Sequence, residues 1–106
     1  MVPRLACLLI PLLALAPTLA WAQDIEQGHQ LATRWCANCH VVERTAAAAS
    51  ANGLPTFPAI ASNPRLTPDF LRATMSAQHG RMPDFQISKR QQDDLVAYIQ
   101  SLKPKP

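Results

Sequence analysis

This 106-residue sequence has few cysteines, no run of basic residues and no strand-like pattern. Each of these features argues against one class of protein. There are three cysteines, and Cys36 and Cys39 lie too close together to link distant parts of a chain, so no disulfide-stabilised scaffold is expected. Ten Lys and Arg are set against seven Asp and Glu with no polybasic run, which does not suggest nucleic-acid binding. No alternating apolar pattern and no internal repeat are found, which favours an all-α protein.

The first 22 residues have the features of a secretory signal peptide. Arg4 supplies a positive charge, residues 5–20 form an apolar run, and the small residues Ala20 and Ala22 flank Trp21 as at a cleavage site. The alternative is an uncleaved membrane anchor, but the run is short for a membrane span and contains two prolines. We therefore predict cleavage after Ala22 and a periplasmic protein, with Cys7 lost in the leader.

The predicted mature domain, residues 23–106, holds 84 of the 106 residues and a net charge of +2. Domains of this size often need a disulfide, a metal or a cofactor to reach adequate stability. Because the two remaining cysteines cannot supply a long-range link, a cofactor is the expected source of that stability.

The five residues Cys36-Ala37-Asn38-Cys39-His40 form a Cys-x-x-Cys-His motif, which is typical of c-type haem attachment. Two thiols on one turn can each add to a vinyl group of one porphyrin, and the following imidazole is then held beside the iron. A thioredoxin-like redox pair would need a βαβ context, and a structural zinc site would need a fourth ligand. No strand-like run or second Cys/His pair follows, so the motif predicts haem.

Helix-start signals and apolar periodicity predict three main helices. The first follows a capping box at Asp24 and Gln27 and ends near the motif, the second covers residues 67–78, and the third runs from 88 to about 102 after a capping box at Ser88 and Gln91. Proline at the second position of the 67–78 segment, and at the start of a short turn over 58–61, suits helix starts. On the helical faces, His29 and Asp94 are expected to face solvent.

A second iron ligand would have to come from across the ring. Met82 is the preferred candidate because it lies outside regular structure, immediately before Pro83, whereas Met75 lies at core spacing within a helix. His79 is the next alternative, and Met75 comes last.

The motif, the late Met82-Pro83 pair and the closing segment 94–99 together resemble the small bacterial class I cytochromes c over residues 23–106. The resemblance implies a cytochrome c fold of three main helices and a short helical turn around one covalent haem c, with His40 and Met82 binding the iron. It also implies that the first and last helices cross near Gly28 and Tyr98. The family also has a proline whose carbonyl accepts the N–H of the axial histidine, on the ring nitrogen that does not bind iron. Pro55 matches that proline best, and Pro58 is the weaker candidate.

By the same resemblance, the chain is expected to be an electron carrier and not an enzyme. Its expected partners are membrane or exported redox proteins that dock transiently, with no nucleic acid and no stable membrane insertion after cleavage. Two alternatives stay open, a haem enzyme or sensor with a labile sixth ligand and a cytochrome subunit of an exported oxidoreductase complex. Arg65 and Arg81 are candidate partners for the haem propionates.

Overall fold

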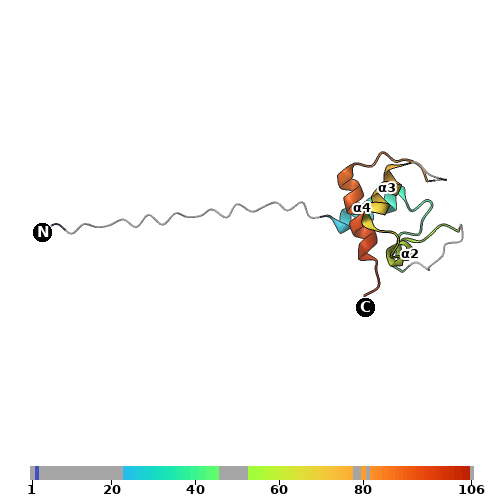
Figure 1. The fold of residues 1–106 in the computed structure, drawn as a ribbon, viewed down its shortest axis with the longest axis horizontal. Coiled ribbons are helices and arrows are strands. Elements are labelled where there is room, and N and C mark those ends of the chain that lie inside the picture. Colours follow the sequence, from blue (N-terminus) through green and yellow to red (C-terminus); the bar gives the residue numbers. More distant parts are fainter. Residues whose placement is uncertain (1, 3–22, 46–52, 78–79, 81, 106) are drawn as a thin grey trace.

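The computed structural model describes Val2, residues 23–45 and 53–77, Gly80, and residues 82–105. These residues form four helices, α1 (Ile25–Trp35), α2 (Phe57–Ser62), α3 (Pro68–Ser76) and α4 (Lys89–Ser101), and none of them belongs to a β-strand (Figure 1). The all-α prediction of three main helices and one short helical turn is confirmed. The predicted signal peptide lies, except for Val2, outside the described residues. No helix among the described residues is long and apolar enough to cross a membrane.

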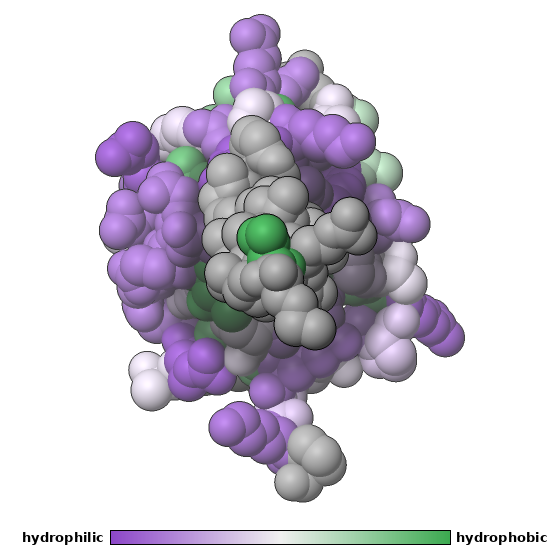
Figure 2. Space-filling view, turned by 90° about the vertical axis from the view of Figure 1, so that its left-hand side faces the viewer, coloured by the Kyte–Doolittle hydropathy of each residue, from purple (hydrophilic) through white to green (hydrophobic). Residues whose placement is uncertain are grey.

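Helix α4 is the centre of the packing, because each of the other three helices contacts it. The core is built from one apolar face of each helix; its members include Leu31, Ala32, Phe57, Ile60, Leu71, Met75, Leu95, Val96, Ile99 and Leu102. The surface differs from this core: around the centre of the face shown in Figure 2, most side chains are hydrophilic. The core is therefore assembled on one long helix that is contributed by the last part of the chain.

Helices α1 and α4 cross at Gly28 more closely than a side chain would allow. A Cβ atom at Gly28 would collide with the backbone carbonyl oxygen of Asp94 and would lie 2.8 Å from Cβ of Tyr98. Glycine is thus needed here for close approach of two backbones. The expected crossing near Gly28 and Tyr98 is confirmed.

The start of α1 differs from its prediction in one instructive contact. The Asp24 side chain accepts the backbone N–H of Gln27 at 3.0 Å, as a helix cap should. The backbone N–H of Asp24, however, donates to Oδ1 of Asp94 at 2.8 Å, in place of the Gln27 side chain of a capping box. Asp94 is 3% exposed, so the prediction that it faces solvent is wrong. Its burial follows from accepting a backbone donor that the helix leaves without an internal partner.

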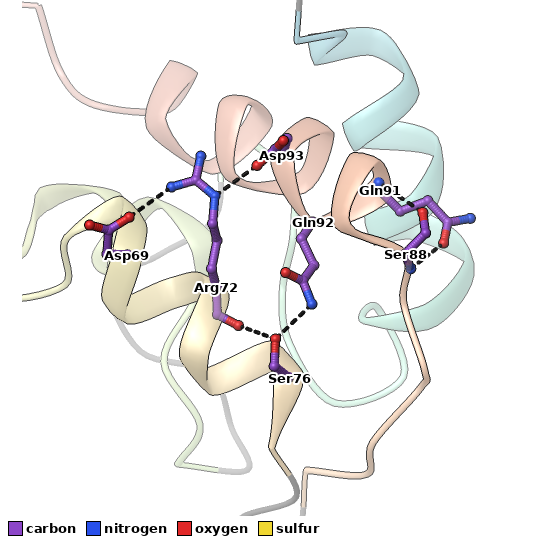
Figure 3. Close-up of polar contacts among 7 residues, drawn as sticks. All are labelled: Asp69, Arg72, Ser76, Ser88, Gln91, Gln92 and Asp93. Atoms are coloured by element: carbon purple, nitrogen blue, oxygen red, sulfur yellow. Dashed lines mark hydrogen bonds and ion pairs between the residues drawn. The ribbon is translucent and has the colours of Figure 1, made fainter.

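Polar contacts tie α3 to α4 along the outer edge of their interface (Figure 3). Arg72 donates from Nε to Asp93 at 2.7 Å and from a terminal nitrogen to Asp69 at 3.2 Å. Gln92 donates to the Ser76 hydroxyl at 2.8 Å, one turn along α3. The capping box predicted at Ser88 is present at the start of α4. These contacts hold α3 so that its buried residues face the interior of the domain.

Candidate functional site

A cavity of about 610 Å³ lies between the end of α1, the other three helices and the loop that precedes α4. Its wall is largely apolar, with contributions from Leu54, Phe57, Ile60, Leu66, Leu71, Leu95 and Ile99. A cavity of this size, lined by hydrophobic side chains with a few polar groups, is typical of a cofactor site. Cys36, Cys39, His40, Met75 and Met82, which are the described Cys, His and Met residues among those predicted for the site, all contribute to this lining.

The motif forms a tight turn at the end of α1. The backbone N–H of Cys36 still donates to the Ala32 carbonyl at 2.9 Å, so the helix delivers Cys36 directly to the cavity. The N–H groups of Cys39 and His40 then fold back onto the Cys36 carbonyl at 3.1 Å and 2.8 Å. This turn brings both sulfurs and the imidazole to the same cavity wall, with Cys36 half-buried and Cys39 exposed.

Burial raises the pKa of the Cys36 thiol to about 11, and the nearby Cys39 adds a smaller effect in the same direction. The desolvated thiolate is disfavoured, because a charge in an apolar wall loses its hydration. Cys36 is therefore a neutral thiol at physiological pH in the folded protein without cofactor.

The imidazole of His40 is oriented by a backbone carbonyl on the neighbouring segment. Its Nδ1 lies 2.7 Å from the carbonyl oxygen of Pro55, and its ring lies 5.6 Å from that of Phe57 between centroids. A carbonyl oxygen only accepts, so Nδ1 carries the proton in this hydrogen bond, and in the neutral imidazole that tautomer leaves the lone pair on Nε2. The donation of the Phe57 N–H to the Val41 carbonyl at 2.9 Å fixes the two segments side by side.

Two thioether side chains line the cavity. Met82 is half-buried and packs against the core from the loop after α3, whereas Met75 is 8% exposed within α3 itself. His79, the second candidate ligand, lies outside the described residues. His29 is not in the lining; its Nε2 lies 3.0 Å from Glu43, and its ring lies 4.9 Å from that of Tyr98. That side chain is 34% exposed, so the prediction of a freely solvated histidine is only partly right.

These residues fit a haem. The wall is apolar where a macrocycle would pack, two cysteines lie on one turn beside it, and the histidine in the same wall is held by a hydrogen bond from Nδ1 to a backbone carbonyl. Imidazole and thioether are established axial donors to haem iron. The described residues contain no group of three or more His, Cys, Asp or Glu that could hold a metal ion by themselves, which leaves the zinc alternative without support there.

Three aromatic residues that were not predicted for the site also line the cavity, namely Trp35, Phe70 and Phe85. Trp35 and Phe85 stack with their ring centroids 6.4 Å apart and an interplanar angle of 8°. Trp35 stands directly before Cys36, and Phe85 stands three residues after Met82. This adjacency to the two motifs was a usable signal. Of the two candidate propionate partners, Arg65 is exposed and Arg81 lies outside the described residues.

Comparison with known proteins found a matching family and a similar protein. Residues 23–99 match the protein family described as "Cytochrome C oxidase, cbb3-type, subunit III". The chain is also 41% identical over 85 residues to "Cytochrome c-552" of Bradyrhizobium diazoefficiens, covering 80% of this chain and 81% of that protein. No solved structure gave a significant match.

Proposed function

Because the chain belongs to the cytochrome c family described as subunit III of the cbb3-type cytochrome c oxidases, we propose that it is a periplasmic carrier of single electrons with one covalent, six-coordinate haem c. Family membership implies a covalent haem c, electron transfer and redox protein partners. The finer proposal is that Cys36 and Cys39 would form the thioether links and that His40 and Met82 would bind the iron.

The observation that carries the proposal is the hydrogen bond between His40 Nδ1 and the Pro55 carbonyl at 2.7 Å. This bond selects the tautomer whose Nε2 can bind iron, and it fixes the ring plane and raises the basicity of the ligand. Pro55 is therefore assigned as the acceptor for the axial histidine. Pro58, the weaker candidate, occupies the first turn of α2 instead.

A haem bound here would supply an iron atom able to alternate between Fe(III) and Fe(II). The chain controls that exchange by its choice of ligands, because a thioether donor favours Fe(II) and raises the reduction potential. The apolar wall excludes water, and two occupied axial positions would leave small oxidants no open coordination site. Little rearrangement then accompanies the electron, which suits a carrier better than an oxidase or peroxidase.

Replacing Met82 tests the ligation directly. Met82→Ala in the ferric holoprotein should abolish the weak far-red absorption band of an Fe(III)–thioether bond, lower the reduction potential and let azide bind the iron. Met75→Leu is the matched control, because it removes the other cavity-lining thioether while keeping an apolar side chain of similar volume. Loss of the band in Met75→Leu, with the band kept in Met82→Ala, would transfer the assignment to Met75.

A second candidate function is permanent assembly into an exported oxidoreductase complex. The description of the matching family, an oxidase subunit, favours it. A free carrier should leave the periplasm as a small monomer on osmotic release, whereas a subunit should remain with a membrane complex. Size-exclusion chromatography of the released fraction, followed at the haem absorbance, separates the two.

A further inference from the structure

The loop that carries Met82 contacts the end of α1, next to the Cys-x-x-Cys-His motif, through two stacked aromatic rings. Phe85 lies parallel to Trp35, with centroids 6.4 Å apart and planes 8° from each other, and both rings line the cavity. Trp35 is the last residue of α1 and precedes Cys36. The stack therefore joins the part of the chain that would bind the porphyrin to the part that would supply the sixth ligand.

The backbone around Phe85 is arranged to present the ring in this direction. Oδ1 of Asp84 accepts the backbone N–H of Gln86 at 2.8 Å, which closes a turn around Phe85. Gln86 has φ of 52°, a conformation that is uncommon for residues other than glycine. Immediately afterwards Ile87 enters the core at 9% exposure. A strained residue persists where its surroundings over-determine it, and here the Asp84 contact and the burial of Ile87 do so.

Within the described residues 82–86, Met82 is half-buried and packs against the core. Pro83, Asp84 and Gln86 are exposed, and Phe85 is 36% exposed while it stacks on Trp35. The stack is thus an aromatic contact between this loop and the body of the domain, three residues from the proposed ligand.

We propose that Trp35 and Phe85 are positioning residues for the sixth iron ligand. Their stack holds the loop against the cavity and lowers the fraction of molecules in which the Met82 thioether has left the iron. This inference rests on the proposed ligation by Met82. The stack, which lies outside the coordination sphere, thus sets how often Met82 occupies the sixth position of the iron. It thereby also sets how well the protein resists competing small ligands. The apparent affinity for a competitor scales with the fraction of open molecules, so a weaker stack raises that affinity.

Competition by imidazole measures this fraction. Ferric holoprotein is titrated with imidazole while the far-red band and the main haem absorbance are followed. Phe85→Ala should tighten apparent imidazole binding about two- to tenfold, the ratio expected from losing one aromatic pair. Phe85→Tyr, which keeps a ring, should restore the wild-type value. Ile25→Ala, which shortens another half-exposed apolar side chain outside the cavity lining, should not change it.

Two further measurements distinguish the effect of losing the stack from the effect of a general loss of stability. Trp35→Leu should act like Phe85→Ala, and the double variant should show little additional change, because both substitutions remove the same contact. Amide hydrogen exchange of residues 84–87 should become faster in Phe85→Ala and not in Ile25→Ala. If Trp35→Leu fails to mature, the Phe85 pair of variants and the exchange rates still decide the question.

The outcomes distinguish this inference from the proposed ligation. If wild type has the thioether band and Met82→Ala loses it, but Phe85→Ala leaves both imidazole affinity and exchange unchanged, the ligation stands and the positioning role is overturned. If Met82→Ala keeps the band, the ligation itself is wrong and the positioning role falls with it.

Discussion

Tyr98 contacts both the crossing of α1 and α4 and the segment that follows the Cys-x-x-Cys-His motif. Its hydroxyl donates to the Val42 carbonyl at 2.7 Å, two residues after His40, and its ring lies 6.4 Å from that of Phe57. Burial raises the pKa of Tyr98, and the carboxylate of Glu43 raises it further, while Arg44 opposes the shift. One side chain of α4 thus holds the chain between His40 and Pro55, the carbonyl acceptor of its imidazole.

The raised pKa of Tyr98 gives a pH-dependent contribution to stability. Because the pKa is higher in the folded state, the contribution is complete below the unfolded value of about 10 and is lost as the pH rises through the folded value. Tyr98→Phe should lower the free energy of unfolding by about 1–2 kcal/mol at pH 7, since the buried Val42 carbonyl loses its donor.

Denaturant unfolding of the wild type and the Tyr98→Phe variant at pH 7 and about pH 11 checks this expectation. The difference in free energy of unfolding between the two proteins should shrink at the higher pH, because only the wild type carries the ionisable hydroxyl. A difference that stays constant over this range would show that the hydroxyl does not titrate differently in the folded and unfolded states.

At the scale of helices, the crossing of α1 and α4 depends on Gly28. Alanine is normally preferred to glycine inside a helix by about 1 kcal/mol, so propensity alone predicts a stabilising Gly28→Ala substitution. The collision of the new methyl group with the Asp94 carbonyl and Tyr98 reverses the sign, and we expect a loss of about 2–3 kcal/mol. The lost free energy is measured by chemical denaturation.

Gln30→Ala is the control for this substitution, because Gln30 is exposed on the same helix. It should change the free energy of unfolding by less than about 0.5 kcal/mol. A Gly28→Ala protein as stable as this control would mean that the two helices can separate without cost.

Local signals in the sequence were sufficient to place the helices, and the reason is that helix starts are short-range events. Thr56, Thr67 and Ser88 each cap a helix with the side chain bonded to the third backbone N–H that follows. The burial of Asp94 could not be found in this way. Its partner, the N–H of Asp24, is 70 residues away, and only the fold brings them together.

The candidate site was predictable to the extent that its groups are contiguous or chemically distinctive. The motif and the methionine before Pro83 carry their chemistry in their own spacing. The stacking of Trp35 on Phe85, and the contact of His29 with Glu43, depend on how the loops return to α1. The periodicity of apolar residues along one helix contains no information about where a loop later packs against that helix.

For the whole molecule, the cavity that would take the haem is continuous with the hydrophobic core. Leu71, Met75, Leu95 and Ile99 belong to both. A bound macrocycle therefore completes the core, and a ligand that binds only the folded state stabilises that state. This dependence explains how a domain of this size can be stable without a disulfide between distant segments.

The attachment claim is tested on the mature protein. Extraction with acid and organic solvent should leave the haem on the polypeptide, and Cys36→Ser or Cys39→Ser should sharply reduce the yield of haem protein. Cys7→Ser should leave the mature product unchanged, since Cys7 lies within the predicted leader. Haem that passes entirely into the organic phase from wild type would rule out thioether links, and a lipidated product that needs Cys7 would overturn the proposed cleavage after Ala22.

The position of α4 after the other three helices in the sequence also affects the order in which contacts can form. The ribosome makes α1 and the motif before it makes Lys89–Ser101, the helix that closes their packing. Until then the surface around Gly28 has no partner and the cavity lacks one wall. Contacts between the two ends of a chain form late, because a long loop must close first. We therefore expect the two cysteines to be accessible for haem attachment until α4 packs against α1, and the cavity to be completed afterwards.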